Sequence, residues 1–301
     1  MKLLEARARI TRDARAFFAS RGYVEVETPI AVPSPGLDLH LDAFALSPGD
    51  RFLSTSPEYQ MKRLVAGGHH RIFQLTRAFR ANERGSRHNP EFTILEFYRA
   101  PASIEAIMRD TEQLVARITG GRTCIDGRTI DLRPPFERLT ICEAFERFAR
   151  TAPEQTLRLA AHDEDTFFRK LVDEVEPALA KIDHAVFVTD YPATQASLAR
   201  KKPSDPRVAE RFELYVAGVE LCNGFGELTD PVEQRARFEA DRKARAREGK
   251  PVYPIDERFL EALAKGLPEF AGNAIGFDRL VAIACGTTSI ASVMAFTDDE
   301  L

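Results

Sequence analysis

The segment FRANERGSRHNPEFTILEFY, residues 79–98, joins two apolar stretches through a polar loop. The stretches at 71–81 and 91–98 are rich in Phe, Ile, Leu and Thr, which favours two β-strands. An arginine at a strand end, here Arg80, can present a planar fork of donors to a phosphate. Phe92, on the returning strand, could stack on a nucleobase. A plain hairpin with an exposed basic loop is the alternative explanation.

A second candidate for anion binding is GFDRL, residues 276–280, which opens an apolar helical stretch. Gly276 permits close approach of a ligand to the backbone. Arg279 stands at the expected helix start, where the helix dipole already favours an anion. The Gly-x-Asp-Arg string is a weak signal alone, so its weight depends on the other segments.

The segment FELYVAGVELCNGFGELTD, residues 212–230, carries glutamates seven residues apart at Glu213, Glu220 and Glu227. If residues 217–218 form a hairpin turn, Glu213 and Glu220 lie near each other on neighbouring strands. Paired carboxylates beside a triphosphate are what Mg²⁺ requires. Solvating charges on an edge strand are a poor alternative, because Leu, Val, Cys and Phe are interleaved with these glutamates.

These segments resemble the motifs of class II aminoacyl-tRNA synthetases of the lysyl branch, from about residue 5 to residue 297. Residues 79–98 are similar to motif 2, with the HNPEFT–LE–Y string of the lysyl enzymes, and GFDRL is similar to motif 3. Residues 212–230 resemble the lysyl signature ELxNGxxEL. Pro29, in VEVETP, resembles the motif 1 proline of the dimer interface, although a strand-ending proline explains it equally well. The resemblance implies an α+β catalytic core, a mostly antiparallel sheet flanked by helices.

The resemblance also implies an ATP site. Arg80 and Arg279 would act in catalysis by holding the α- and γ-phosphates, and Glu213 and Glu220 would bind Mg²⁺. The family usually has Arg-x-Glu where this chain has Asn82 followed by Glu83, so either residue could contact adenine. The full set of implied ATP-binding residues is Arg80, Asn82, Glu83, His88, Asn89, Phe92, Glu220, Leu221, Gly276 and Arg279.

A pocket for a lysine-type diamino acid is implied in the same way. In TSPEYQMKRL, residues 55–64, Glu58 could simply cap a helix. By the resemblance, Glu58 and Glu227 instead bind the terminal ammonium with charge-assisted hydrogen bonds, and they would reject neutral side chains. The implied substrate-binding residues are Ser56, Pro57, Glu58, Tyr98, Asn223, Glu227 and Ala274. The run DYPATQASLAR, residues 190–200, resembles a substrate-pocket segment with no role that chemistry alone assigns.

The expected lack of an anticodon-binding domain beside this core indicates the acceptor of the activated amino acid. Lysyl-tRNA synthetases carry an N-terminal OB-fold domain that reads the anticodon, whereas here the motif 1 region falls within the first thirty residues. We therefore expect a single catalytic domain over residues 1–301, with no anticodon-binding OB domain. Such a core resembles the family of elongation factor P lysyltransferases.

Two local strings also resemble that family, QAS at 195–197 and ASLA at 196–199. Ala274 stands where tRNA-charging enzymes usually have Gly, and the resemblance implies that its added methyl group favours (R)-β-lysine over α-lysine. The resemblance implies elongation factor P as partner, a homodimer, and no tRNA acceptor. A tRNA-charging enzyme and a non-catalytic paralogue are the alternatives, and the presence of Arg80 and Arg279 argues against the second.

Composition limits the remaining classes. The 301 residues are 44% hydrophobic, and the net charge of −4 argues weakly against a protein that coats nucleic acid. The charged stretch 232–248 is either a nucleic-acid surface or, as we favour, a solvated helix with i,i+4 pairs. The four cysteines lack CxxC spacing, which suggests neither zinc nor disulfides and favours a cytoplasmic location. No signal peptide or membrane span is apparent in the sequence.

Hydrophobic periodicity predicts the other elements. Short turns between strands, in place of regular βα alternation, favour an antiparallel sheet. The expected helices are 3–18, 58–66, 103–118, 140–149, 164–180, 232–248 and 256–265. The expected strands are 23–28, 71–81, 91–98, 185–190, 208–217 and 219–228, with a strand running into a helix at 274–284.

Overall fold

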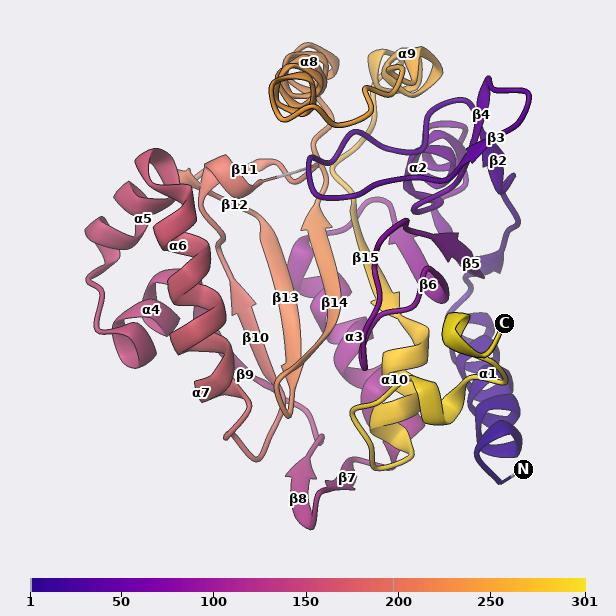
Figure 1. Ribbon diagram of the computed structural model, residues 1–301, viewed down its shortest axis with the longest axis vertical. Helices are drawn as coiled ribbons and strands as arrows, with labels where there is room; N and C mark the ends of the chain where they lie inside the picture. The colour runs from indigo at the N-terminus through magenta and orange to yellow at the C-terminus, as the bar shows by residue number, and fades with distance from the viewer. Residues whose placement is uncertain (1, 197) are drawn as a thin grey trace.

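The computed structural model describes residues 2–196 and 198–301. In this part of the chain an eight-stranded sheet forms the centre of the molecule, with helices around it (Figure 1). In spatial order its strands are β1 (Val24–Glu25), β5 (Arg71–Phe79), β6 (Glu91–Arg99), β15 (Ala271–Gly276), β14 (Val219–Gly226), β13 (Arg211–Val216), β10 (Val186–Thr189) and β9 (Glu137–Thr140).

Neighbouring strands of this sheet run antiparallel except at its two edges, where β1 pairs with β5 and β9 pairs with β10 in parallel. The expected α+β architecture is therefore confirmed. Short connections explain the antiparallel centre. For example, Ala217 and Gly218 join β13 to β14 with φ angles of 48° and 75°, which suit a two-residue hairpin turn.

The helices that surround the sheet come from all parts of the chain. Their bounds are α1 (Lys2–Ser20), α2 (Glu58–Ala66), α3 (Ile104–Thr119), α4 (Ile141–Ala149), α5 (Pro153–His162), α6 (Glu164–Lys170), α7 (Glu176–Leu179), α8 (Pro231–Arg247), α9 (Glu257–Ala264) and α10 (Phe277–Ala284). Three small sheets complete the described elements: β2 (Ala31–Val32), β4 (Arg51–Leu53) and β3 (Ala45–Leu46); β7 (Arg122–Ile125) and β8 (Arg128–Asp131); β11 (Lys201–Lys202) and β12 (Asp205–Ala209).

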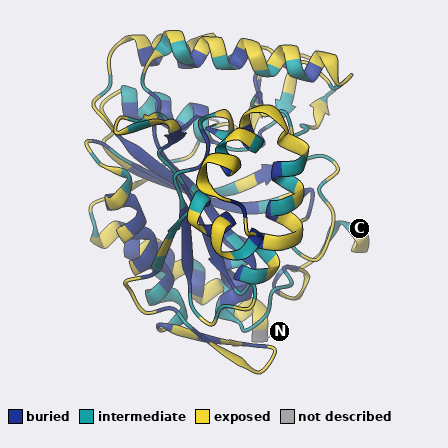
Figure 2. Ribbon diagram, turned by 90° about the vertical axis from the view of Figure 1, so that its left-hand side faces the viewer, coloured by how far each residue is buried: buried dark blue, intermediate teal, exposed yellow. Residues whose placement is uncertain are grey.

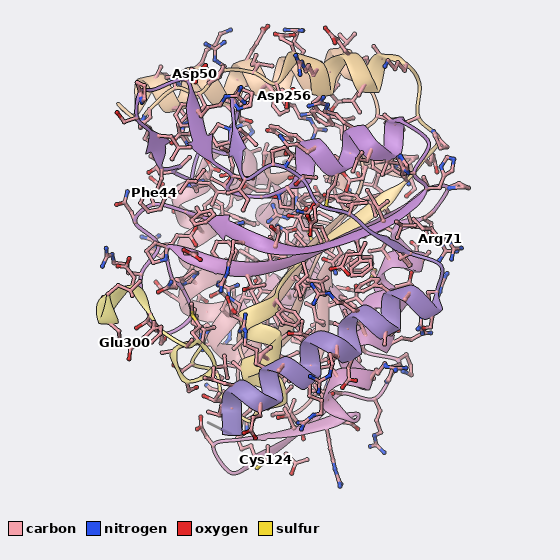
Figure 3. All side chains as sticks on the ribbon, turned by 90° about the vertical axis from the view of Figure 1, so that its right-hand side faces the viewer. Phe44, Asp50, Arg71, Cys124, Asp256 and Glu300 are labelled. Carbon is pink, nitrogen blue, oxygen red and sulfur yellow. The ribbon has the colours of Figure 1, made fainter. Side chains whose placement is uncertain are left out.

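The two faces of the large sheet differ in chemistry because side chains alternate along each strand. One face carries residues such as Phe97 and Phe212 and packs into the main apolar core with α1, α3 and α10. Figure 3 shows α1 crossing beside β5 and β6, close to Arg71. The opposite face carries Glu96, Glu213 and Asn223. Figure 2 shows the strands buried between helices whose outer surfaces are exposed.

Helices cover only the ends of this polar face. At one end α4 to α7 pack over β9 and β10 in a second apolar cluster. At the other end α2 packs over Ile72 and Tyr98, and α8 and α9 pack against α2. The middle strands β6, β15 and β14 are therefore left to face a site.

Some expected elements were wrong in extent. The strand expected at 23–28 is limited to β1, because only its first residues pair with β5. The strand expected at 208–217 is divided between β12 and β13, because Glu210 leaves the ladder and donates its N–H to Arg200. The helix expected at 164–180 contains a π-helical turn at Leu171–Val175 between α6 and α7. Helix α5 was not expected from the sequence.

Helix α8 is more than the solvated helix that the sequence analysis favoured. The expected i,i+4 pairing occurs between Glu233 and Arg237 at 2.6 Å. Arg245, however, is fully buried and donates to the carbonyl oxygens of Asp38 and Leu41 at 2.7 and 2.9 Å. It also forms a 2.6 Å ion pair with Asp42. Helix α8 thus holds the loop that runs beside the start of the motif 2 region. Among the described residues, no helix is long and apolar enough to cross a membrane.

Candidate active site

A cavity of about 130 Å³ lies on the polar face, where β6, β14 and β15 meet the start of α10 and the loop between β5 and β6. It brings together the three segments that the sequence analysis singled out. Of the expected ATP-binding residues, those that line it are Arg80, Glu83, His88, Asn89, Phe92, Glu220, Leu221, Gly276 and Arg279. Two expected substrate-binding residues, Asn223 and Ala274, also line it.

Arg80 and Phe92 form one wall of the cavity. The hairpin register places Phe92 opposite Ala78, so its ring lies beside the chain that leads to Arg80. The Arg80 guanidinium carbon is 5.0 Å from the centre of the Phe92 ring. The Arg80 Nε donates to the carbonyl oxygen of Thr55 at 3.3 Å, which fixes the side chain. A cation and an aromatic face are thus adjacent, as binding of a nucleotide requires.

Arg279 enters the cavity from the first turn of α10. Its neighbour Asp278 is buried and accepts the Thr93 N–H at 2.7 Å, which fixes the helix start against β6. Arg279 donates to the Glu220 carbonyl oxygen and to His88 Nε2, both at 2.8 Å. Burial and the Arg279 charge lower the pKa of His88, so the ring is a neutral acceptor.

The two candidates for the adenine contact differ in position. Asn82 does not line the cavity, and its backbone is left-handed with φ of 68°. Glu83 lines the cavity and lies 3.8 Å from Arg80. The position of Glu83 therefore favours it for this role, which stays a prediction for both residues.

A β-bulge brings the two expected metal ligands to one face. Leu214 lies opposite Cys222 and Tyr215 opposite Glu220, so Leu221 is an extra residue on β14. Without the bulge, simple alternation would place Glu220 and Asn223, three residues apart, on opposite faces. The register makes Asn223, not Glu220, the cross-strand neighbour of Glu213.

Glu213 and Glu220 differ in how free their carboxylates are to bind a metal ion. Glu213 is buried and accepts hydrogen bonds from Tyr191 at 2.6 Å, Tyr215 at 2.8 Å and Arg211 at 2.6 Å. The Glu220 side chain is 42% exposed and opens into the cavity. Partial burial and the negative charge of Glu213 raise the pKa of Glu220 to about 7. A bound cation would offset both effects, so this pair fits Mg²⁺ held by one or two carboxylates and substrate phosphates.

The two carboxylates expected to bind a terminal ammonium lie together, but a third charged group lies between them. Glu58 follows Pro57 at the start of α2, and Glu227 follows β14. The Lys62 ammonium is 2.6 Å from Glu58 and in direct contact with Glu227. The Lys62 and Glu227 side chains are each 1% exposed. No role for Lys62 was expected from the sequence.

Glu96 is a third carboxylate of this end of the site that the sequence analysis missed. It is completely buried on β6 and accepts hydrogen bonds from Ser56 at 2.5 Å and Tyr98 at 3.1 Å. Burial and the charge of Glu58 raise its pKa to about 7. It lies opposite Ala274 on β15, beside the cavity. Strand alternation within the quoted LE–Y string was the signal that could have indicated it.

Small residues of β15 lie beside these carboxylates. Ala274 lies between Glu96 on one neighbouring strand and Asn223 on the other. A side chain at Gly272 would collide with the Tyr98 ring and reach 3.1 Å from Glu227 Oε1. The absence of a side chain at Gly272 is therefore what lets Tyr98 lie across β15.

The segment at 190–200 borders the same pocket. Ala199 pairs with Glu227, and the Leu228 N–H donates to the Leu198 carbonyl oxygen at 3.0 Å. Arg211 donates to the Gln195 carbonyl oxygen at 2.6 Å. Ser197, which belongs to both the QAS and ASLA strings, lies outside the described residues.

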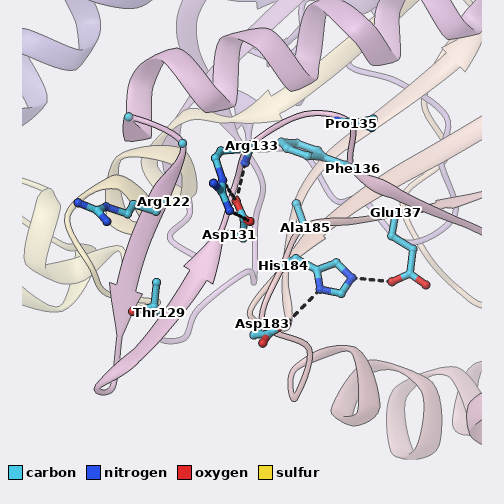
Figure 4. A pocket seen from close by; sticks show the side chains of 12 residues that line it. Arg122, Thr129, Asp131, Arg133, Pro135, Phe136, Glu137, Asp183, His184 and Ala185 are labelled. Carbon is cyan, nitrogen blue, oxygen red and sulfur yellow. Dashed lines mark hydrogen bonds and ion pairs between the residues drawn. The ribbon is translucent and has the colours of Figure 1, made fainter.

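A larger hollow of about 1000 Å³ lies near β7, β8 and β9, outside the motifs (Figure 4). Five of its charged side chains pair with one another. Arg133 pairs with Asp131 at 2.5 Å, and His184 contacts Glu137 at 2.6 Å and Asp183 at 3.1 Å. None of the expected site residues lines this hollow.

A hairpin with Arg80 and Phe92, a helix start with Arg279 and a mostly antiparallel sheet together define a class II synthetase core. The model of the family tRNA synthetases class II (D, K and N) matches residues 1–300, and the chain belongs to this family, whose members use ATP. The elongation factor P--(R)-beta-lysine ligases of Salmonella dublin, Salmonella paratyphi B and Salmonella heidelberg are each 42% identical to it. Each alignment covers 98% of this chain and 94% of the relative.

Proposed function

We propose that this protein activates a lysine-type diamino acid, (R)-β-lysine or lysine, with ATP and transfers the acyl group to a lysine ε-amine of elongation factor P. The observation that carries the proposal is the pairing of a cationic ATP-type cavity with an anionic pocket on one sheet face. The names of the relatives support the acceptor.

The reaction would occur in two steps. A carboxylate oxygen of the amino acid attacks the α-phosphorus of ATP, the bond to the β-phosphate oxygen breaks, and pyrophosphate leaves. The ε-amine of the acceptor then attacks the acyl carbon, an amide forms, a proton is lost, and AMP leaves. Positions of Arg80 and Arg279 on two walls of the cavity suit neutralisation of phosphate charge during the first step. We assign no general base.

Glu220, with Glu213 behind it, would hold Mg²⁺. The ion would neutralise phosphate charge when it is bound. Glu220 is the more available ligand because the Glu213 oxygens already accept hydrogen bonds from Arg211, Tyr191 and Tyr215. This assignment rests on the raised pKa of Glu220 and its opening to the cavity.

The pocket chemistry supports a diamino acid. Glu58, Glu96 and Glu227 converge there, and Tyr98 and Asn223 add polar groups. We propose that the Ala274 methyl group, placed between Glu96 and Asn223, moves the substrate amino group and favours (R)-β-lysine. Replacement of Ala274 by Gly should then shift preference toward α-lysine.

ATP–pyrophosphate exchange with α-lysine and (R)-β-lysine side by side tests activation. Mass spectrometry of elongation factor P, compared with acylation of tRNA, tests the acceptor. We expect exchange with at least one isomer and a mass increase of elongation factor P. An unchanged mass together with charged tRNA would identify a tRNA synthetase instead. No exchange with any isomer would indicate a non-catalytic paralogue.

We further propose a homodimer formed through the region around Pro29, a single catalytic domain over residues 1–301, and a cytoplasmic location. Val24 and Ile30, on either side of Pro29, are 59% and 41% exposed, which suits burial against a second copy. Light scattering after size exclusion tests the dimer, and replacement of Val24 by Asp should shift the mass toward the monomer.

A further inference from the structure

Lys62 occupies the position between Glu58 and Glu227 where a substrate ammonium is expected. Its side chain is 1% exposed, and its ammonium is paired with both carboxylates. The Phe225 ring centre lies 5.9 Å away and encloses the group further. A lysine held this way inside packed protein cannot leave as a substrate would. It is therefore a fixed part of the pocket.

The spacing of Glu58 and Lys62 has the form of an ordinary helix surface pair, but its environment is different. Exposed i,i+4 pairs contribute little to stability. A buried ammonium is costly unless it is fully paired. Burial lowers the pKa of Lys62, and Glu227 and Glu58 outweigh that effect and raise it above the usual value. Lys62 is thus positively charged throughout the physiological range.

The charges of this pocket do not balance without a ligand. The described groups that face it are three carboxylates, one ammonium and the neutral Tyr98 hydroxyl: Glu58, Glu96, Glu227, Lys62 and Tyr98. Burial raises the pKa of Glu96 to about 7 and that of Glu227 to about 8, and Lys62 lowers the latter. When all three carboxylates are ionised, two negative charges remain uncompensated. A diamino acid brings two ammonium groups, whereas an ordinary amino acid brings one.

We propose that Lys62 is a positioning and specificity-determining residue, a built-in counter-ion that separates Glu58 from Glu227 and favours their ionised forms, so that the pocket selects an amino acid with two ammonium groups. This inference rests on the proposed function, because it specifies the substrate class of the same pocket. Without Lys62, the two adjacent carboxylates would share a proton, since like charges at short distance cannot both ionise. An arriving ammonium would then have to displace that proton.

The test is ATP–pyrophosphate exchange by the full chain as a function of pH from 6 to 8.5. Lys62→Met keeps most of the length of the side chain and removes its charge. In this variant we expect the pH midpoint for the amino-acid KM to rise by at least about one unit. We also expect the preference for lysine over 6-aminohexanoate, which has one ammonium group, to fall at least about tenfold, while the KM for ATP changes less than about twofold.

Two further variants separate charge from packing. Glu58→Gln with Lys62→Met removes one charge of each sign, so the pH midpoint should return toward the wild-type value. Lys170→Met is the matched control, because Lys170 forms an i,i+4 pair with Glu174 at 3.0 Å on a helix outside the pocket. It should leave both the midpoint and the preference unchanged.

The outcomes are distinct. An unshifted midpoint in Lys62→Met, or a double variant as defective as the single one, overturns the inference. Loss of a cooperative melting transition in both variants also overturns it, in favour of a purely structural lysine. A wild-type protein that exchanges with no lysine isomer contradicts the proposed function itself, which is a different result from a Lys62 variant that behaves like wild type.

Discussion

The two ends of the polar sheet face differ in charge and in openness. At the ATP end, Arg80 and Arg279 line an open cavity of about 130 Å³. At the amino-acid end, Glu96 and Glu227 are buried and already have protein partners. The ATP end is thus open before its ligand binds. The side chains of the amino-acid end are already held by protein partners, although their charges do not balance without the substrate.

This difference predicts how each end responds to mutation. At the open end, loss of a cation should impair phosphate chemistry and leave folding intact. At the buried end, loss of a carboxylate should impair binding of the amino acid and also affect stability, because its partners lose their counter-charge. Kinetics that resolve the two substrates separate these effects.

Replacement of Arg279 by Ala is expected to have the largest effect. Arg279 is held by Glu220 and His88 with its guanidinium on the cavity wall, so its loss removes stabilisation of phosphate charge. We expect kcat of pyrophosphate exchange to fall about 100- to 1000-fold. The melting temperature should stay near that of wild type. A change in the amino-acid KM alone would instead place Arg279 at the other end of the site.

Replacement of Glu227 by Gln should reduce kcat/KM for the diamino acid about 100-fold, because a charge-assisted partner of the ammonium is lost. The KM for ATP should change less than about twofold if the two ends act separately. The measurement is exchange with each substrate varied in turn. An equal loss for both substrates would show that Glu227 serves ATP or the metal.

Two glycine substitutions test whether the effect of an added methyl group on the amino-acid KM depends on which face of the large sheet carries it. Gly272→Ala places a methyl group against Tyr98 on the polar face, and Gly224→Ala places one against Phe212 in the core. Each should reduce stability by about 2 kcal/mol. Only Gly272→Ala should also raise the amino-acid KM, by about 30-fold, because Tyr98 must move. Equal KM values in the two variants would contradict this role of Tyr98.

The titration of Glu96 should make the amino-acid KM depend on pH, which distinguishes the amino-acid end from the ATP end. Burial and the Glu58 charge raise the pKa of Glu96 to about 7, so it is partly protonated in the empty pocket at neutral pH. The carboxylate that accepts an ammonium forms as pH rises through 7. The KM should therefore fall about tenfold from pH 6 to pH 8. Glu96→Gln should weaken this dependence, and a KM that rises with pH would contradict it.

The open end could be predicted from the sequence and the buried end only in part. Arg80, Phe92 and Arg279 stand in strings whose residue types and order already indicate a nucleotide site. Their cavity needs only a hairpin and a helix start. Local patterns predict such elements well, since both depend on neighbouring residues.

The residues that were missed depend on long-range pairing. Glu96 acquires a role only when the strand order places it opposite Ala274. Lys62, four residues after Glu58, has the spacing of a surface pair, and only the approach of Glu227 from a distant strand makes it internal. The bulge at Leu221 likewise has no local signal. For Glu96, Lys62 and Leu221 alike, packing between segments distant in the sequence determines the position of the residue.

The smallest expected effect concerns the C-terminal segment, which contacts the motif 2 loop at the ATP end. Arg84, in the motif 2 loop, lies 2.5 Å from Asp298, whose N–H donates to Asn89 at 2.9 Å. Asp299 also lies 3.6 Å from Arg84. Exposed ion pairs contribute about 0–1 kcal/mol, so Asp298→Ala should raise the KM for ATP about threefold and leave the amino-acid KM unchanged.

Asp299→Ala is the matched control for the Asp298–Arg84 contact. Asp299 lies farther from Arg84 than Asp298 does, and its side chain is 86% exposed. It should therefore change neither KM. Equal effects of the two substitutions would mean that net charge near the cavity, and not the Asp298 contact, acts on ATP. If Asp298→Ala changes the KM for ATP and Asp299→Ala does not, the contact between Asp298 and Arg84 limits how far the ATP end opens.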